Sequence, residues 1–305
     1  MLSSLQEEAY DEGSVQKGYD LMHSYNRSIQ VQQEGMLQRS HSTRYVDAHI
    51  HFDQYTAEEQ QSIMAALEKE SVTHLIAVSM NMASCVQNEA LAAQYPRQIV
   101  PAYGYHPEQP VASQDELEQL LGWMDDRQTS IRAVGEVGLP YYLREEALKE
   151  GRSFDLAPYE EQLLPFIQRA ARWDVPIVLH AVYDDAPRVC ELLEHWNVQK
   201  AHFHWFKGDA KTIERMAQNG YYVSFTPDIE YEAEIQSLAS SYPIQQVMSE
   251  TDGPWPFEGS FCGRKTEPGM VTTVVQNWAK LVGLTEEEAQ KQMWDNACRL
   301  YKLTS

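Results

Sequence analysis

Two histidines separated by one residue follow a short apolar run near position 50. Tyr45 and Val46 begin a predicted strand, which continues through Asp47-Ala48-His49-Ile50-His51. Because residues two apart on a strand point to the same side, His49 and His51 present two imidazoles in one direction. Two converging imidazoles make half of a divalent-metal site. The alternative is one buried and one exposed histidine with no shared role, since so short a motif also occurs by chance.

Four more residues of ligand type stand where other apolar runs end, namely Glu136, His180, His204 and Asp252. Each has a simpler interpretation. Glu136 could be a loop carboxylate in solvent and His180 a core histidine. His204 competes with His202 on the same side of its strand, and Asp252 before Gly253 could simply start a turn. Together with the two first histidines they make six nitrogen and oxygen ligands, which is enough for two divalent ions with room for water and substrate.

Eight short apolar runs alternate with helical patterns and would position these side chains. The runs are Tyr45–His49, Leu75–Ser79, Ile99–Tyr103, Ile131–Gly135, Pro176–His180, Lys200–His204, Tyr221–Phe225 and Gln246–Glu250. Apolar residues at three- and four-residue spacing between them indicate helices, as at Ile63, Met64 and Leu67, and at Leu163, Phe166, Ile167 and Ala170. This order predicts an α/β fold, a (β/α)8 TIM barrel. The rival open sheet would require a glycine-rich phosphate loop, and no such motif is present.

In such barrels the carboxyl ends of all strands meet at one mouth, where active sites lie. The six ligand-type residues are therefore predicted to converge there. We expect one domain over residues 45–305, ending in helices near 269–282 and 285–303, the second started by Thr285 before three glutamates. Residues 1–44 are rich in Gln, Glu and Ser and form a predicted polar extension, with a helical pattern near 18–37.

The composition limits the classes of partner. A net charge of −21 over 305 residues argues against tight binding to duplex DNA, which requires a Lys and Arg surface. No segment approaches the roughly 20 apolar residues of a membrane span, so no membrane association is expected. Four scattered cysteines without a CxxC pair indicate a reducing compartment, and with no apolar leader near Met1 we expect a cytoplasmic protein. The oligomeric state is not predicted.

These blocks resemble the TatD family of metal-dependent deoxyribonucleases, within the amidohydrolase-like barrels, from about Tyr45 to Leu303. The matches follow in order: Asp47–His51 for the opening DxHxH, Tyr103–Pro107 for the histidine-proline segment, Val134–Leu139 for GEIGLD, Pro176–His180 for the histidine of the fifth strand, His204–Gly208 for HCFSG, Glu250–Trp255 for ETDSPYL, Gly263–Pro268 for GKRNEP and Asn296–Tyr301 for NAxRLF. So many ordered blocks are specific for the family and much less specific for the substrate.

The resemblance implies that His49, His51 and Asp252 hold one ion, that His180 and His204 hold a second, and that Glu136 bridges the two. It favours His204 over His202, and it implies that His106 contacts substrate phosphate. The ions would be Mg²⁺, Mn²⁺ or Zn²⁺. Two departures concern the substrate: Pro140 replaces an Asp, and the Arg of the family's HSRDA segment is missing after His180.

Other cations could replace that arginine. Lys207 and Arg264 are candidate substrate contacts, or ordinary surface charges. We expect a hydrolase that uses a metal-activated water and acts on phosphodiesters of DNA ends or single strands, with Asp252, Glu136 and His106 as catalytic groups. The alternatives are a hydrolase of a small amide, lactone or phosphoester, and a non-catalytic metal-binding module that docks through residues 1–44.

Overall fold

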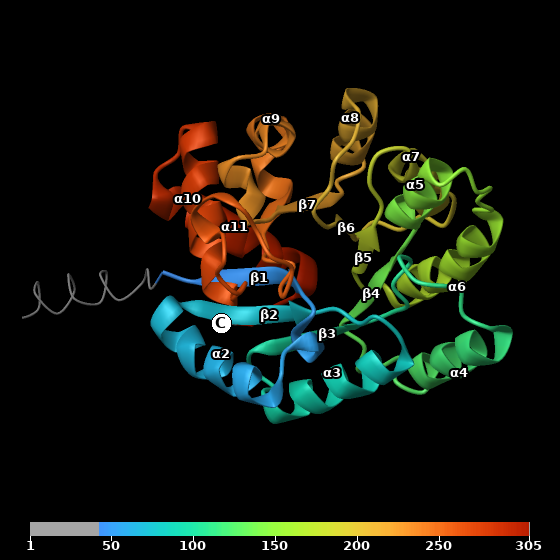
Figure 1. Cartoon of the computed structure of the whole chain (residues 1–305). Helices are drawn as coiled ribbons and strands as arrows, with labels where there is room; N and C mark the ends of the chain where they lie inside the picture. Colours follow the sequence, from blue (N-terminus) through green and yellow to red (C-terminus); the bar gives the residue numbers. More distant parts are fainter. Residues whose placement is uncertain (1–42, 305) are drawn as a thin grey trace, which may run out of the picture. The chain divides into compact units, whose positions relative to one another are not determined.

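The structure is a computed structural model and describes residues 43–304, in which eight parallel strands follow one another in chain order around a barrel (Figure 1). A parallel bridge between Ile50 and Gly253 joins the first strand to the segment after the last. The strands are β1 (Tyr45–Ile50), β2 (Val72–Ala77), β3 (Ile99–Tyr103), β4 (Ala133–Gly138), β5 (Ile177–His180), β6 (Ala201–Phe203), β7 (Tyr222–Phe225) and β8 (Val247–Ser249). The predicted (β/α)8 TIM barrel is confirmed.

Helices lie between successive strands and after the last one. They are α2 (Ala57–Glu70), α3 (Met82–Gln94), α4 (Gln114–Asp125), α5 (Tyr141–Lys149), α6 (Ala157–Trp173), α7 (Asp185–His195), α8 (Ala210–Gln218), α9 (Ala233–Ser241), α10 (Val271–Val282) and α11 (Glu286–Tyr301). No described helix has the length and apolar character needed to cross a membrane.

The helices pack through the apolar stripes expected from their sequences. In α6 the residues Leu163, Phe166, Ile167 and Ala170 are all buried. The start signal at Thr285 is a capping box, in which Thr285 and Glu288 each accept a hydrogen bond from the other's backbone N–H. Local sequence thus fixes where the last helix begins.

Small and large side chains from several strands share one buried cluster. Ala48, Ala102 and Ala133 are fully buried in one cluster with larger residues such as Ile76 and Met248. Gly104 marks a close approach between two strand ends, since a Cβ there would lie 2.6 Å from the Glu136 carbonyl oxygen. The segment that carries His106 therefore packs directly against the one that carries Glu136.

The second and fourth predicted strands are displaced by two or three residues at both ends, whereas the other predicted bounds differ by at most one residue. The second strand begins at Val72, three residues earlier than expected, and the fourth runs to Gly138, so Glu136 lies within β4 rather than beyond its end. The register between β4 and β5 shifts between Val134 and Val137. Such an irregularity re-aims a side chain within a strand, and it depends on the partner strand rather than on local sequence. The expected extension lies outside the described residues except for residues 43 and 44.

Candidate metal centre

The histidines of the first strand converge as predicted. His49 lies in β1 and His51 follows it directly, and their Nε2 atoms are 3.1 and 3.3 Å from the same oxygen, Oε2 of Glu136. Both also face Oδ1 of Asp252, at 3.2 Å from His49 and 3.5 Å from His51. Asp47 supports this group from behind, because its buried carboxylate accepts hydrogen bonds from the backbone N–H of His49 and of Thr251.

The second carboxylate oxygen of Glu136 faces a different set of imidazoles. Oε1 lies 3.1 Å from Nδ1 of His180 and 2.7 Å from Nε2 of His204. Those two nitrogens are 3.3 Å from each other. Glu136 is fully buried between the two groups. The other five predicted ligands therefore meet around Glu136, and the six residues come from five different strands or the loops that follow them.

Several polar atoms in this cluster are buried and lack a hydrogen-bond partner. They are Nδ1 and Nε2 of His49, Nδ1 of His51 and of His204, Oε2 of Glu136 and Oδ1 of Asp252. Leaving such atoms unpaired is costly. Ligands that share an ion at about 2.1 Å lie about 3.0 to 3.4 Å apart, and the contacts described above, at 2.7 to 3.5 Å, lie within or close to this range. Imidazole nitrogens and carboxylate oxygens of this set therefore fit divalent cations.

Electrostatics keep the two carboxylates ionised. Burial opposes the charge of Glu136, but His106, His204 and His49 around it hold its pKa well below the usual range. Burial likewise opposes the ionisation of Asp252, and its contacts with His49 outweigh that and lower its pKa. Two ionised carboxylates in a buried site favour a cation between them.

His106 lies in the same cluster but is best described as a hydrogen-bond donor. Its Nδ1 accepts the backbone N–H of Glu108 at 3.1 Å, so in the neutral ring Nε2 carries the hydrogen. Burial lowers the pKa of His106, which favours that neutral form. Nε2 lies 3.3 Å from Glu136 Oε1. A nitrogen that carries hydrogen cannot bind a metal, so His106 is suited to donate to a substrate oxygen beside the ions.

Glu108 was not predicted and belongs to this site. Its Oε1 lies 3.1 Å from Nε2 of His180, opposite the Nδ1 that faces Glu136. The backbone N–H groups of Tyr142 and Leu143, at the start of α5, each donate to Glu108 at 2.8 Å. A carboxylate that accepts from Nε2–H leaves Nδ1 free for an ion. The sequence signal that could have identified Glu108 is its position two residues after His106.

The choice between His202 and His204 follows from their contacts. His202 has its Nδ1 2.7 Å from the Tyr301 hydroxyl and its Nε2 2.5 Å from the Ser224 hydroxyl. Ser224 in turn donates to Glu250. Both nitrogens of His202 are thus engaged behind the site, whereas His204 faces Glu136.

The two predicted substrate cations lie apart from the pocket lining. The Lys207 ammonium is 5.9 Å from the centre of the Trp205 ring, and the Arg264 guanidinium is 5.6 Å from the centre of Phe261. Neither lines the pocket over the ligand cluster. Their role in substrate binding stays a prediction.

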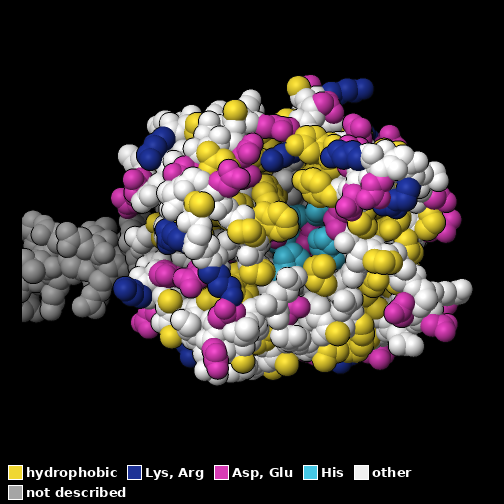
Figure 2. Space-filling model, in the orientation of Figure 1, with side chains coloured by type: hydrophobic (Ala, Val, Ile, Leu, Met, Phe, Trp, Pro, Cys, Tyr) yellow, Lys and Arg dark blue, Asp and Glu magenta, His cyan; other side chains and the backbone are white. Residues whose placement is uncertain are grey.

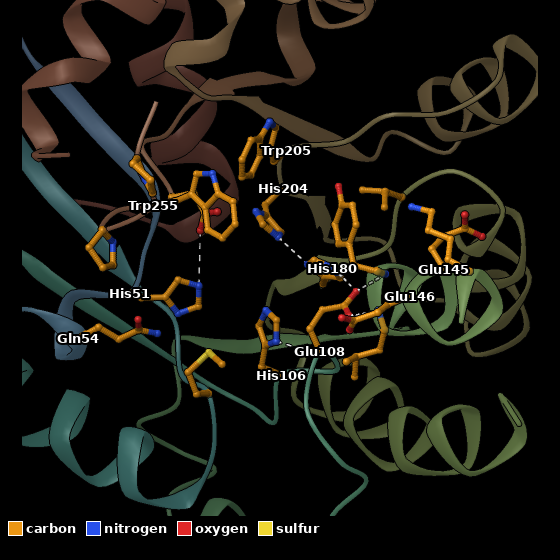
Figure 3. A pocket seen from close by; sticks show the side chains of 18 residues that line it. His51, Gln54, His106, Glu108, Glu145, Glu146, His180, His204, Trp205 and Trp255 are labelled. Atoms are coloured by element: carbon orange, nitrogen blue, oxygen red, sulfur yellow. Dashed lines mark hydrogen bonds and ion pairs between the residues drawn. The ribbon is translucent and has the colours of Figure 1, made fainter. Parts of the chain in front are cut away.

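A pocket of about 900 Å³ opens over the cluster. Figure 2 shows the histidines at the bottom of a hollow with hydrophobic side chains beside it. In Figure 3, Trp205 and Trp255 stand on one side of the pocket, and Glu145 and Glu146 on the other. Lys149 is the one lysine or arginine in the lining. The metal cluster is therefore open to a ligand of moderate size.

Comparison with known proteins matches most of the chain to one family. The family model described as TatD related DNase matches residues 46–302. An "Uncharacterized metal-dependent hydrolase" of Haemophilus influenzae is 37% identical over 257 residues, which cover 84% of this chain and 99% of that protein. A Danio rerio protein named "Putative deoxyribonuclease tatdn3" is 24% identical over 84% of this chain and 97% of its own length.

Among solved structures, the TatD homologue YjjV of Escherichia coli superimposes with a TM-score of 0.73 at 23% identity, covering 86% of this chain and 99% of that one. That likeness concerns the fold. The family match and the close relative go further: the chain belongs to the TatD family of metal-dependent hydrolases.

Proposed function

We propose that this protein is a deoxyribonuclease that hydrolyses phosphodiester bonds at DNA ends or in single strands with the help of two divalent ions. The observation that carries the proposal is the position of Glu136, whose two oxygens face separate groups of imidazoles. A carboxylate placed in this way suits a bridge between two ions. The description of the family as DNases and the name of the Danio rerio relative support DNA as the substrate.

The proposed ligands divide according to these contacts. His49, His51 and Asp252 would hold one ion, and His180 and His204 the other, with Glu136 shared between them. His51 and Asp252 of the first group and both histidines of the second line the pocket, so substrate and water could reach both ions from that side.

Two divalent ions at this place would supply a nucleophilic water at neutral pH and offset charge on the phosphoryl group. Asp252 is ionised and lies at the pocket surface, so it accepts the proton of the attacking water. His106 donates its Nε2–H to a non-bridging oxygen. As the new phosphorus–oxygen bond forms, the ester bond breaks and the leaving oxygen takes a proton from solvent.

The test combines metal analysis with cleavage of a labelled oligonucleotide. We expect two ions per chain in the wild-type protein, fewer in Glu136→Gln, and a fall in cleavage rate of about 100-fold or more in His51→Ala and Asp252→Ala. His195→Asn, at the exposed end of α7, serves as the control. A wild-type protein loaded with Mg²⁺, Mn²⁺ or Zn²⁺ that leaves the oligonucleotide intact would refute the proposal.

A second candidate is a hydrolase of small phosphoesters, favoured by the acidic side of the pocket. Glu108, Glu145 and Glu146 line it against a single lysine, and carboxylates repel a strand with many phosphates. Faster turnover of a phosphomonoester than of any oligonucleotide would favour this candidate.

A further inference from the structure

Two tryptophans form an aromatic wall beside the metal cluster. Trp205 follows β6 directly after His204, and Trp255 follows β8 three residues after Asp252. Their ring centres are 6.0 Å apart at an angle of 68°, and Phe257 packs against Trp205 at 5.6 Å. Both indoles line the pocket, as Figure 3 shows. Each therefore lies within a few residues of a proposed metal ligand.

Trp205 is held firmly in a backbone conformation that is unusual for its type. Its φ is 40°, in the left-handed region. Its backbone N–H donates to Glu250 Oε1 at 2.8 Å and its indole N–H to Asp228 Oδ2 at 2.6 Å. Both carboxylates are buried. Glu250 thus fixes the backbone and Asp228 the ring. Strain of this kind is retained mainly at functional sites.

Trp255 is anchored through its backbone, while its ring faces solvent. Its N–H donates to the carbonyl of Asp252 at 3.0 Å, and its own carbonyl accepts from the Thr266 hydroxyl. The residue is nevertheless 57% exposed, the largest fraction among the exposed large hydrophobic residues of the described chain. Together with Trp205, this indole forms an aromatic patch at the pocket, and apolar patches of this kind mark ligand-binding sites.

The charges of the pocket restrict what that ligand can be. Glu145 and Glu146 face the aromatic wall from α5, with Lys149 as the one lysine or arginine in the lining. Those carboxylates would repel a run of phosphates. The indoles would instead stack on a flat, uncharged ring such as a nucleobase.

We infer that Trp255, backed by Trp205, is a base-stacking subsite, and that the substrate is a nucleotide end with one base on this wall and its phosphate at the metal cluster. This inference rests on the proposed phosphodiester hydrolysis and deepens it. Stacking on an aromatic ring typically contributes about 5- to 150-fold in affinity per base.

The test uses the metal-loaded enzyme and a thymidine dinucleotide, compared with the same compound made abasic at either position. For the wild type we expect KM to be about 5- to 150-fold lower for the dinucleotide than for the abasic compound that lacks the stacked base. In Trp255→Ala that preference should vanish with little change in kcat. Trp255→Phe should retain most of it, and Trp196→Ala should retain all of it, since Trp196 is exposed at the end of α7 and does not line the pocket.

A binding experiment makes the result independent of catalysis. Thymidine monophosphate should quench tryptophan fluorescence of the wild type and of Trp196→Ala, and quench Trp255→Ala much less, at matched circular dichroism. Equal KM ratios and equal quenching in the wild type and Trp255→Ala would overturn the subsite. If the wild type cleaves neither dinucleotide nor abasic form, the proposed function fails, and the quenching experiment still decides whether a base binds here.

Discussion

At the scale of single residues, the site depends on which ring nitrogen of each histidine faces the cluster. His49, His51 and His204 present Nε2, whereas His180 presents Nδ1. The sequence predicts that these histidines converge, because strand parity and the barrel mouth require it. It does not predict the nitrogen, because side-chain torsion and neighbouring contacts decide that.

Glu108 provides a direct test of this orientation. Removing its carboxylate in Glu108→Ala leaves His180 Nε2 without its acceptor, so we expect metal affinity to fall about 10- to 100-fold. Glu108→Gln retains an acceptor oxygen without the charge and should lie between that variant and the wild type. Competition with a chromophoric chelator measures the affinity, and nitrogen NMR of His180 reports the tautomer.

The matched control is Glu145→Ala, which removes a carboxylate of the same pocket from α5. Its metal affinity should stay close to that of the wild type. If Glu108→Ala and Glu145→Ala bound metal equally well, the hydrogen bond to His180 would have no orienting role.

At the scale of elements, apolar runs identified all the strands of residues 43–304. The one ligand whose place in its strand was wrong, Glu136, shows what such runs do not encode. The run at Ile131–Gly135 suggested that Glu136 follows a strand, whereas it lies inside β4 at a change of register with β5. Register is a property of two strands together. Trp205 and Trp255 were not predicted as site residues for a similar reason. Their role depends on how the loops after β6 and β8 meet, which no local pattern encodes.

The contact between β6, β7 and α11 yields a prediction about pH. His202 is buried, donates through Nε2 to Ser224 and accepts at Nδ1 from Tyr301, which requires the neutral ring. Burial lowers its pKa well below 6.5 in the folded protein. The unfolded chain takes up a proton below about pH 6.5, so the stability that this residue provides is present above that pH and is lost as the pH falls.

In His202→Asn the free energy of unfolding should therefore fall by about 2 to 3 kcal/mol at pH 8, through lost hydrogen bonds. The difference from wild type should narrow below pH 6.5 by up to about 1.4 kcal/mol per pH unit. Urea unfolding at pH 8, 6.5 and 5.5, with metal content held constant, measures this. A difference that stayed constant or widened towards low pH would show that His202 is not held neutral. The control variant His195→Asn measures how the same substitution affects stability at an exposed histidine.

At the scale of the whole molecule, the net charge of the chain repels nucleic acid, whereas metal ions at the proposed site would attract it. The chain carries a net charge of −21, and the acidic residues of the pocket add local repulsion. Two divalent ions would contribute four positive charges at one point, where a single phosphate can approach. We therefore expect attraction to be confined to the mouth of the barrel.

This confinement predicts that binding depends on metal and on a free end. In EDTA and about 100 mM salt, a blunt 30-base-pair duplex should bind more weakly than the 10⁻⁴ to 10⁻⁶ M typical of nonspecific DNA-binding proteins. A single-stranded oligonucleotide with cleavage-resistant phosphorothioate linkages should bind only when Zn²⁺, a cation that accepts imidazole and carboxylate ligands, is added. Fluorescence anisotropy measures both. Submicromolar binding of the duplex in EDTA would mean that an extended basic surface exists despite the net charge, and the substrate strand would then be held along the molecule rather than at its mouth.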